Sequence, residues 1–316
     1  MGDLTRFTPG EIEAKRKKIS RILQSECGRD VLGAMLGMDF SEAPDLNGKP
    51  MVEVLVPTYK AFDPLMDAAA REMLKHSRQF CTVNVQPTMP CGVVHWARNM
   101  LLAPLYRDKS KFTHVLFMDD DMLPEKDFLV RLLRHEKDIV GALATHRTDP
   151  PLPNISRWDA ETNSYYRVFD WKKDALIGHG GTVAVGAGML LISRHALDLI
   201  AEFYLNCEYE LQMWAPAIDK LEETRAKRRA FFEETGNALW FDFLKAPNGK
   251  AELGEDVSFC YKAHLCGLKV YVDTSIQPGH VGKYTYGIKD FLPYQQELLA
   301  AEGKAGWKFR LNEDAE

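Results

Sequence analysis

The sequence lacks a hydrophobic run long enough to cross a membrane. Its longest strongly apolar stretch, Val183–Ile192, is about half of what a bilayer span requires. The first residues contain no apolar segment typical of a signal peptide. Cysteine is scarce and scattered, without a CxxC pair: Cys27, Cys81, Cys91, Cys207, Cys260 and Cys266. We therefore expect a reduced, cytoplasmic protein with no transmembrane segment.

An excess of positive charge is also absent. The 40 Lys and Arg residues against 45 Asp and Glu residues give a formal charge of 40 − 45 = −5. This argues against a general nucleic-acid coat, because nonspecific binding requires a positive surface. The composition is otherwise that of a globular protein, with 46% hydrophobic and 27% charged residues. A chain of 316 residues buries about 75% of its unfolded surface, so the core requires no disulfides.

The first half of the chain predicts an N-terminal extension followed by an α/β domain. Residues 1–50 are expected to form a helical extension and a linker, with a capping box at Thr8–Glu11 and turn formers in Ala43–Pro50. Strands and helices then alternate. The expected strands are Val52–Val56, Phe80–Val85, His114–Met118 and Asp138–Leu143, and the expected helices are Pro64–His76, Val93–Tyr106 and Glu125–His135. This order predicts a mostly parallel sheet flanked by helices.

The second half is less regular. Arg157–Trp171 is expected to form a hairpin or loop. The further expected elements are the strands Met189–Ser193 and Lys269–Val272 and the helices Arg194–Leu205, Ile218–Glu234 and Glu255–Cys266. We expect the domain to extend over residues 51–290, with a helical insertion near 206–250 and a tail at 291–316. The insertion is predicted to be a helical hairpin with an apolar inner face, or a lid whose aromatic residues, Trp240 among them, stack on an acceptor.

The sharpest local signal is the triplet Asp119, Asp120 and Asp121 at the end of the predicted strand His114–Met118. Ligands of parallel sheets lie at the carboxyl ends of the strands. Alternate residues of an extended segment face the same way, so Asp119 and Asp121 can share one site. Two ionised carboxylates there require compensation, and Mg²⁺ or Mn²⁺ supplies it. The alternative is a solvated acidic turn that caps the next helix.

Two further motifs contain candidate catalytic or metal-binding residues. Glu255 and Asp256 follow Gly254 and open a predicted helix. They either interact with the helix dipole or provide a general base for an attacking hydroxyl. His280 lies in a glycine-flanked loop after the last predicted strand, and it is either structural or a metal ligand that meets Asp121. Lys283 follows it closely and is a candidate contact for a diphosphate.

These motifs, in this order, resemble those of a GT-A-type nucleotide-sugar glycosyltransferase of the broad family-2-like group of bacteria and phages. The resemblance extends from about Met51 to Tyr286. The segments that carry it are Val54–Tyr59, Ala97–Asn99, Phe117–Asp121, Gly186–Arg194, Gly254–Phe259 and His280. It implies a GT-A fold, a hexosyltransferase-like activity, and a divalent metal cofactor, Mn²⁺ or Mg²⁺.

The resemblance also implies roles for single residues. Pro57, Thr58 and Tyr59 border the base of a nucleotide-sugar donor, a UDP- or GDP-sugar. Arg98 lies near the ribose or the diphosphate, and Asp119 contacts the ribose or a metal-bound water. The cation and diphosphate are held by Asp121 and His280, with Asp119, Asp120 and Lys283 nearby. Asp256, or alternatively Glu255, is the base, which gives inversion at the sugar carbon.

The sequence leaves the acceptor and two alternative functions open. The acceptor is a glycan, a lipid-linked glycan, a protein or modified DNA. A metal-dependent phosphohydrolase would use Asp119 as its nucleophile, although Met122 follows the triplet where that motif usually has Thr or Val. A noncatalytic module would bind a nucleotide or glycan without turnover. Donor binding that depends on a metal, together with transfer to an acceptor, separates the three readings.

Overall fold

The computed structural model describes residues 49–58, 63–86, 91–178, 183–206, 221–246, 252–282 and 284–300. The predicted N-terminal helical extension, the candidate residues Tyr59 and Lys283, and the chain beyond residue 300 lie outside the described residues.

A seven-stranded sheet forms the centre of the described part. In spatial order its strands are β2 (Thr82–Val85), β1 (Met51–Leu55), β3 (His114–Met118), β10 (Met189–Ser193), β5 (Ile139–Ala142), β13 (Val270–Asp273) and β8 (Leu176–Ile177). All strands except β10 and β8 run in one direction. The prediction of a mostly parallel sheet is confirmed. The insertion of β10 between β3 and β5, antiparallel to both, was not predicted.

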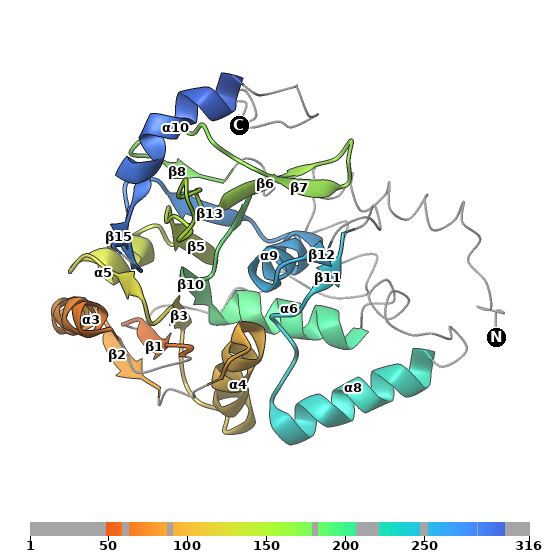
Figure 1. Cartoon of the computed structure of the whole chain (residues 1–316). Helices are drawn as coiled ribbons and strands as arrows, with labels where there is room; N and C mark the ends of the chain where they lie inside the picture. Colours follow the sequence, from red (N-terminus) through yellow and green to blue (C-terminus); the bar gives the residue numbers. More distant parts are fainter. Residues whose placement is uncertain are drawn as a thin grey trace.

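Helices cover both faces of this sheet, which gives three layers (Figure 1). α3 (Pro64–Ser77) and α5 (Phe128–Arg134) lie on one face, and α4 (Val94–Arg107), α6 (Arg194–Asn206) and α9 (Glu255–Leu265) lie on the other. Neighbouring strand residues face opposite layers. Val54 accordingly packs in the core below α3, whereas Leu55 packs in the larger core below α4 and α9. Both layers therefore depend on the mainly apolar residues of the central strands.

The local signals for the helices explain their observed limits. α3 begins at Pro64, and the side chain of Asp63 accepts a hydrogen bond from the Leu65 amide at 2.8 Å. α5 was predicted from Glu125 but begins at Phe128. The reason is that β4 (Met122–Leu123) first pairs with a strand near the C-terminus, which keeps the chain after the aspartate triplet extended.

Two small sheets flank the carboxyl edge of the central sheet. One consists of β4, β14 (Gly279–Val281) and β15 (Thr285–Tyr286). The other consists of β6 (Ile155–Asp159), β7 (Ser164–Arg167) and β9 (Val183–Val185). Where a hairpin or loop was expected over Arg157–Trp171, the structure has the hairpin of β6 and β7, whose first strand begins two residues earlier, at Ile155. These sheets bring distant parts of the chain beside the triplet that follows β3.

The predicted helical insertion contains α8 (Leu221–Thr235), which lies beside α4 and α6 (Figure 1). Gly236 ends it at a φ of 73°, where a Cβ would clash with the carbonyl of Ala103. The following chain enters the core and reaches β11 (Leu244–Lys245), which pairs with β12 (Glu252–Leu253). Trp240 is fully buried and donates its indole N–H to the Leu197 carbonyl at 2.9 Å. The lid hypothesis was therefore wrong for Trp240, which is a core residue and cannot stack on an acceptor.

The C-terminal helix α10 covers residues Ile288–Ala300, so the predicted domain boundary at residue 290 falls inside it. Phe291 is fully buried and stacks against Trp171 with 5.8 Å between ring centroids. This corrects the expected tail: residues 291–300 belong to a helix whose buried side chains, Phe291 and Leu299, pack in the core.

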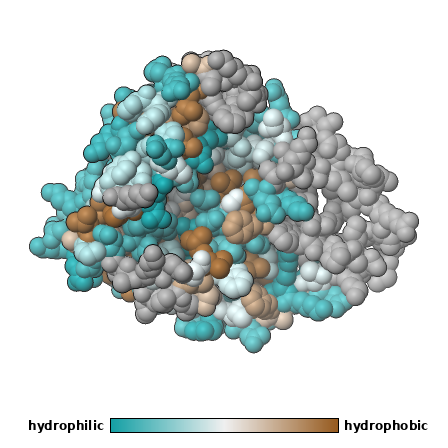
Figure 2. Space-filling model, viewed as in Figure 1, coloured by the Kyte–Doolittle hydropathy of each residue, from teal (hydrophilic) through white to brown (hydrophobic). Residues whose placement is uncertain are grey.

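No helix in the described ranges is long and apolar enough to cross a membrane. On the face shown in Figure 2, the hydrophobic residues form small separate patches among polar ones. The described cysteines, Cys81, Cys91, Cys260 and Cys266, are all free thiols.

Candidate active site

The three aspartates after β3 point to three different groups of partners. Asp119 is bound by Arg98 from α4, and Asp120 accepts a hydrogen bond from the hydroxyl of Thr58 at 2.5 Å. Asp121 contacts Arg147 and His280. The triplet is therefore not a freely solvated turn: each carboxylate joins a different segment of the chain to the carboxyl edge of β3.

Arg98 connects Asp119 to the start of α9. Its Nη2 donates to Asp119 Oδ1 at 2.9 Å, and its Nη1 donates to Glu255 Oε1 at 2.7 Å. The guanidinium is 3% exposed and lies 5.6 Å from the ring centroid of Phe241. Burial lowers the Arg98 pKa, but the charges of Asp119, Glu255 and Asp256 outweigh burial and raise it. Arg98 thus stays charged and organises a cluster of three carboxylates.

The glycines of the segment Gly186–Gly188 allow the backbone to approach these carboxylates. The Asp119 amide donates to the Gly188 carbonyl at 2.8 Å. A Cβ on Gly188 would lie 2.9 Å from Asp119 Oδ2, closer than side chains tolerate. A Cβ on Gly186 would lie 3.4 Å from Asp256 Oδ2 and 3.3 Å from the amide nitrogen of Asn154. Glycine at 188 therefore makes room for Asp119.

Asp256 is partly buried at the first turn of α9. One of its oxygens, Oδ1, accepts the Val257 amide at 2.7 Å. Burial and the neighbouring charge of Glu255 raise the pKa of Asp256 from 3.8 to about 6, although Arg98 opposes the shift. A carboxylate with a pKa near the working pH is suited to general-base chemistry.

Asp121 and His280 meet because β14 pairs with β4, which places His280 opposite Met122. His280 Nε2 lies 3.1 Å from Asp121 Oδ1, and Arg147 Nη1 lies 2.8 Å from Asp121 Oδ2. Burial alone would raise the Asp121 pKa, but the hydrogen bond and charge of His280 and the charge of Arg147 outweigh it and lower the pKa. Burial likewise lowers the pKa of His280, yet its bonds to Asp121 and to the Thr145 carbonyl raise it overall.

The carboxylate oxygen of Asp121 and the imidazole nitrogen of His280 are suitable ligands for a divalent cation. His280 Nδ1 lies 2.6 Å from the Thr145 carbonyl oxygen, so Nδ1 carries the proton and Nε2 faces Asp121. Metal-binding histidines generally donate the N–H of their other ring nitrogen in this way, which fixes the tautomer. Asp119, Asp121 and His280 were the predicted ligands. The structure brings Asp121 and His280 together, whereas Asp119 contacts Arg98 instead. Among the described residues, no cluster of three or more His, Cys, Asp and Glu side chains is arranged to hold a metal ion. Water and phosphate oxygens commonly complete such sites for Mg²⁺.

Several groups at this edge were missed by sequence reasoning. Glu53 is 4% exposed in β1 and accepts the side-chain amides of Asn84 at 2.7 Å and Gln86 at 2.6 Å. In the sequence, Glu53 could have been noticed as the only charged residue within the apolar run Val52–Val56. Arg147 and Arg167 were also missed, since each lies in a polar stretch that carries no motif. Pro57 and the buried Thr58 follow β1 at the same edge.

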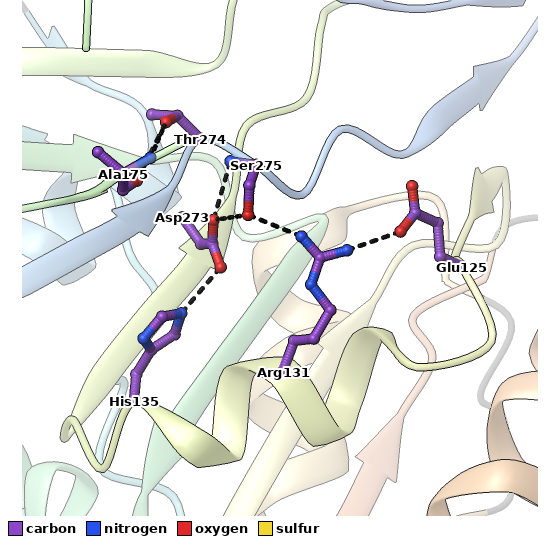
Figure 3. Close-up of polar contacts among 7 residues, drawn as sticks. All are labelled: Glu125, Arg131, His135, Ala175, Asp273, Thr274 and Ser275. Carbon is purple, nitrogen blue, oxygen red and sulfur yellow. Dashed lines mark hydrogen bonds and ion pairs between the residues drawn. The ribbon is translucent and has the colours of Figure 1, made fainter. Parts of the chain in front are cut away.

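In a second polar network at this edge, the side chains bond to one another (Figure 3), and we call it the closed network. Asp273, at the end of β13, accepts the amide and the hydroxyl of Ser275 with one oxygen, and His135 Nε2 lies 2.8 Å from the other. Arg131 joins the Ser275 hydroxyl at 2.7 Å to Glu125 at 2.7 Å. The network fastens α5 to the end of β13, and both Asp273 oxygens have partners.

Comparisons with known proteins give only distant similarity. No protein-family model matches the chain, and no curated protein matches it. Among solved structures, A197 from STIV aligns at a TM-score of 0.36 and 16% identity over 74% of this chain and 86% of that one. A glycosyltransferase involved in the glycosylation of the major capsid of PBCV-1 aligns at a TM-score of 0.29 and 10% identity, over 54% of this chain and 73% of that one.

Proposed function

We propose that this protein is a metal-dependent glycosyltransferase, which moves a hexose or similar sugar from a nucleotide-diphosphate donor to an acceptor hydroxyl. One observation carries the proposal. The carboxyl edge of the sheet combines the Asp121–His280 pair, whose histidine tautomer is fixed by Thr145, with Asp256, whose pKa is raised to about 6. A cation-binding pair and a separate near-neutral base are the two groups that such a transfer requires.

Asp256 is the proposed base. In the transfer, the acceptor oxygen forms a bond to the sugar carbon, and the bond from that carbon to the diphosphate oxygen breaks. The acceptor proton passes to the Asp256 carboxylate, and the electron pair leaves with the nucleoside diphosphate. A carboxylate with a pKa near 6 is ionised at neutral pH and still basic enough to accept this proton. Inversion at the sugar carbon is the expected stereochemical result.

Asp121 and His280 are the proposed protein ligands of Mn²⁺ or Mg²⁺. When bound, the cation would stabilise the charge that develops on the leaving diphosphate. Arg147 occupies Asp121 Oδ2 and is 49% exposed, so it can give up this oxygen at low cost and turn toward a phosphate. Arg98 keeps Asp119 in a fixed orientation, and Thr58 does the same for Asp120 beside the expected nucleotide-binding loop.

The proposal is tested by incubating the full chain with UDP- and GDP-sugars and Mn²⁺ and measuring slow release of the nucleoside diphosphate. We expect release with one donor class, and we expect Asp121→Ala to abolish it while the circular dichroism spectrum is retained. Asp67→Ala, an exposed carboxylate on α3, is the matched control and should release at the wild-type rate. Free phosphate from simple phosphomonoesters would instead indicate a phosphohydrolase that uses Asp119. Nucleotide binding without any release would indicate a noncatalytic module.

A further inference from the structure

Arg167, at the end of β7, is a partly buried cation that pairs with no side chain or carbonyl in the described part of the chain. No hydrogen bond or ion pair of its guanidinium exists within the described ranges of the chain. Removing a charge from water without pairing it is costly, so proteins usually supply a counter-charge or leave the position for a ligand. Because no described residue pairs with its guanidinium, Arg167 is a candidate ligand-binding residue.

The strand register puts Arg167 on the same face as the proposed base. Arg167 lies opposite Ser156, and Ser156 lies opposite Ala184 on the next strand. Residues paired across neighbouring strands share one face, and so do residues two positions apart along a strand. Gly186 is two positions after Ala184, so Arg167 and Gly186 are on the same face. The Gly186 amide continues this ladder by donating to the Asn154 carbonyl at 3.0 Å. Gly186 is also the residue whose Cβ would meet Asp256 Oδ2 at 3.4 Å.

The charges around Arg167 agree with this placement. Burial lowers the pKa of Arg167, and the Asp256 carboxylate opposes this. No ion pair joins Arg167 to Asp256, so the two charges are near each other without touching. Burial and the charges of Arg167 and His280 lower the pKa of His146 to about 4, so His146 is neutral at physiological pH and adds no positive charge beside Arg167. Besides Arg98, Arg167 is thus a second cation in the surroundings of the Asp256 carboxylate.

We propose that Arg167 binds an anionic group of the acceptor, next to the hydroxyl that Asp256 deprotonates. The acceptor is then a sugar or other alcohol that carries a phosphate or a carboxylate. An arginine fork recognises either group through paired charge-assisted hydrogen bonds. This inference rests on the proposed function and makes it more specific, because it defines the class of acceptor that the base can serve.

The test compares Arg167→Gln with Arg157→Gln in the full chain. Arg157 is a matched control because it lies on neighbouring β6, is also partly buried, and by strand alternation faces the opposite side of the sheet. Transfer from the donor found above is measured with glucose, glucose 6-phosphate and glucuronate as acceptors. The nucleoside diphosphate Kd is measured in the same preparations. The phosphate and carboxylate arms tell which anion the site takes.

We expect the wild type to prefer at least one anionic acceptor, with a kcat/KM about 10- to 100-fold above that of the neutral sugar. Arg167→Gln should remove most of this preference, and Arg157→Gln should keep it. Two results would overturn the inference: equal behaviour of the two variants, or a nucleoside diphosphate Kd weakened in Arg167→Gln by as much as acceptor use. The second result would assign Arg167 to the donor. If the wild type neither binds a nucleoside diphosphate nor releases one, the proposed function itself fails.

Discussion

Two acidic residues at the same edge of the sheet have opposite properties. Asp273 ends β13, and Asp256 begins α9 nearby in the sequence. Burial acts to raise both pKa values. Around Asp273, hydrogen bonds from Ser275 and His135 outweigh burial and lower the pKa. Around Asp256, Glu255 adds to burial, and the pKa rises to about 6. In this comparison, hydrogen-bond donors offset the effect of burial on the pKa at Asp273 and do not offset it at Asp256.

The closed network of Asp273 contributes to stability, whereas the open cluster of Asp256 costs stability. Each satisfied buried hydrogen bond contributes roughly 0.5–1.5 kcal/mol, and charged partners contribute more. A carboxylate held near other carboxylates is instead destabilising when ionised. Such a cost persists at functional sites, where it tunes a group for its task.

Asp256→Asn should have the largest effect, a loss of transfer of about 10²- to 10⁴-fold, because the acceptor proton then has no base. Donor binding should persist. In the wild type, kcat/KM should fall as the pH drops below about 6, since the base becomes protonated. Transfer kinetics over a pH series check both statements. Unchanged transfer by Asp256→Asn would exclude this residue as the base.

The same substitution should increase stability at neutral pH. The folded state holds the Asp256 proton up to about pH 6 and the unfolded state only to about 3.8, so folding is weakened as the pH rises through this window. Asparagine cannot ionise and avoids the penalty, which is at most about 3 kcal/mol. Thermal unfolding at pH 4.5 and pH 7.5 should show a gain for Asp256→Asn that is larger at the higher pH. A gain of the same size at both values would contradict the shift.

Asp273→Asn should reduce the free energy of unfolding by about 2–3 kcal/mol, because the bonds to Ser275 and His135 are weakened in a buried place. Its pKa is lowered in the folded state, so this stabilisation is present above the ordinary value and is lost as the pH falls below it. Denaturant titration measures the loss, and transfer per folded molecule should stay at the wild-type level. A selective loss of transfer would show that the closed network belongs to the site.

Gly188→Ala should reduce donor affinity several-fold and stability by about 1–2 kcal/mol. The added methyl would lie 2.9 Å from Asp119 Oδ2 and would displace the carboxylate that Arg98 holds. Gly287→Ala is the matched control, since the nearest atom to its Cβ is 3.9 Å away. Calorimetric titration of the nucleoside diphosphate into both variants checks the prediction. Equal donor affinity in the two variants would mean that the Asp119 position is unimportant for the donor.

Arg147→Gln should have the smallest effect, and in the opposite direction: Mn²⁺ affinity without nucleotide should increase up to about fivefold. The substitution removes a cation that competes for Asp121 Oδ2, and exposed ion pairs are worth about 0.2–1 kcal/mol. Nucleoside diphosphate affinity with Mn²⁺ should decrease, because a phosphate contact is lost. Electron paramagnetic resonance of free Mn²⁺ measures the first change. Arg71→Gln, which breaks an exposed ion pair with Asp67 on α3, should change neither affinity.

The layers of the fold could be predicted from local signals. Apolar runs such as His114–Met118 and the Asp63–Pro64 helix start are visible in a few residues, and β3 and α3 form as they indicate. The antiparallel position of β10 was not predictable, because its four apolar residues, Met189–Ile192, suit an interior strand of either direction. The sequence placed the candidate site residues at the ends of elements, and their roles stay predictions.

The partners within the site were not predictable. Arg98 and Glu255 are 157 residues apart, and only the folded chain reveals that Arg98 binds Glu255 and Asp119 together. Arg147 reaches Asp121 from a loop without a motif, and Arg167 reaches the region of Asp256 through a strand register set by the β6–β7 hairpin. Charge compensation depends on such long-range pairings, which residue spacing does not encode.

The central claim is that Asp121 and His280 bind a divalent cation together with a nucleoside diphosphate. Its most direct test is a thermal-shift panel of UDP, GDP, CDP and dTDP, each with and without Mn²⁺, on the wild type and Asp121→Ala. A ligand at a hundredfold its Kd adds about 2.7 kcal/mol of stability. The account predicts that one nucleotide stabilises the wild type only with Mn²⁺ and does not stabilise Asp121→Ala. Stabilisation that is equal in the variant, or absent for all four nucleotides, would contradict it.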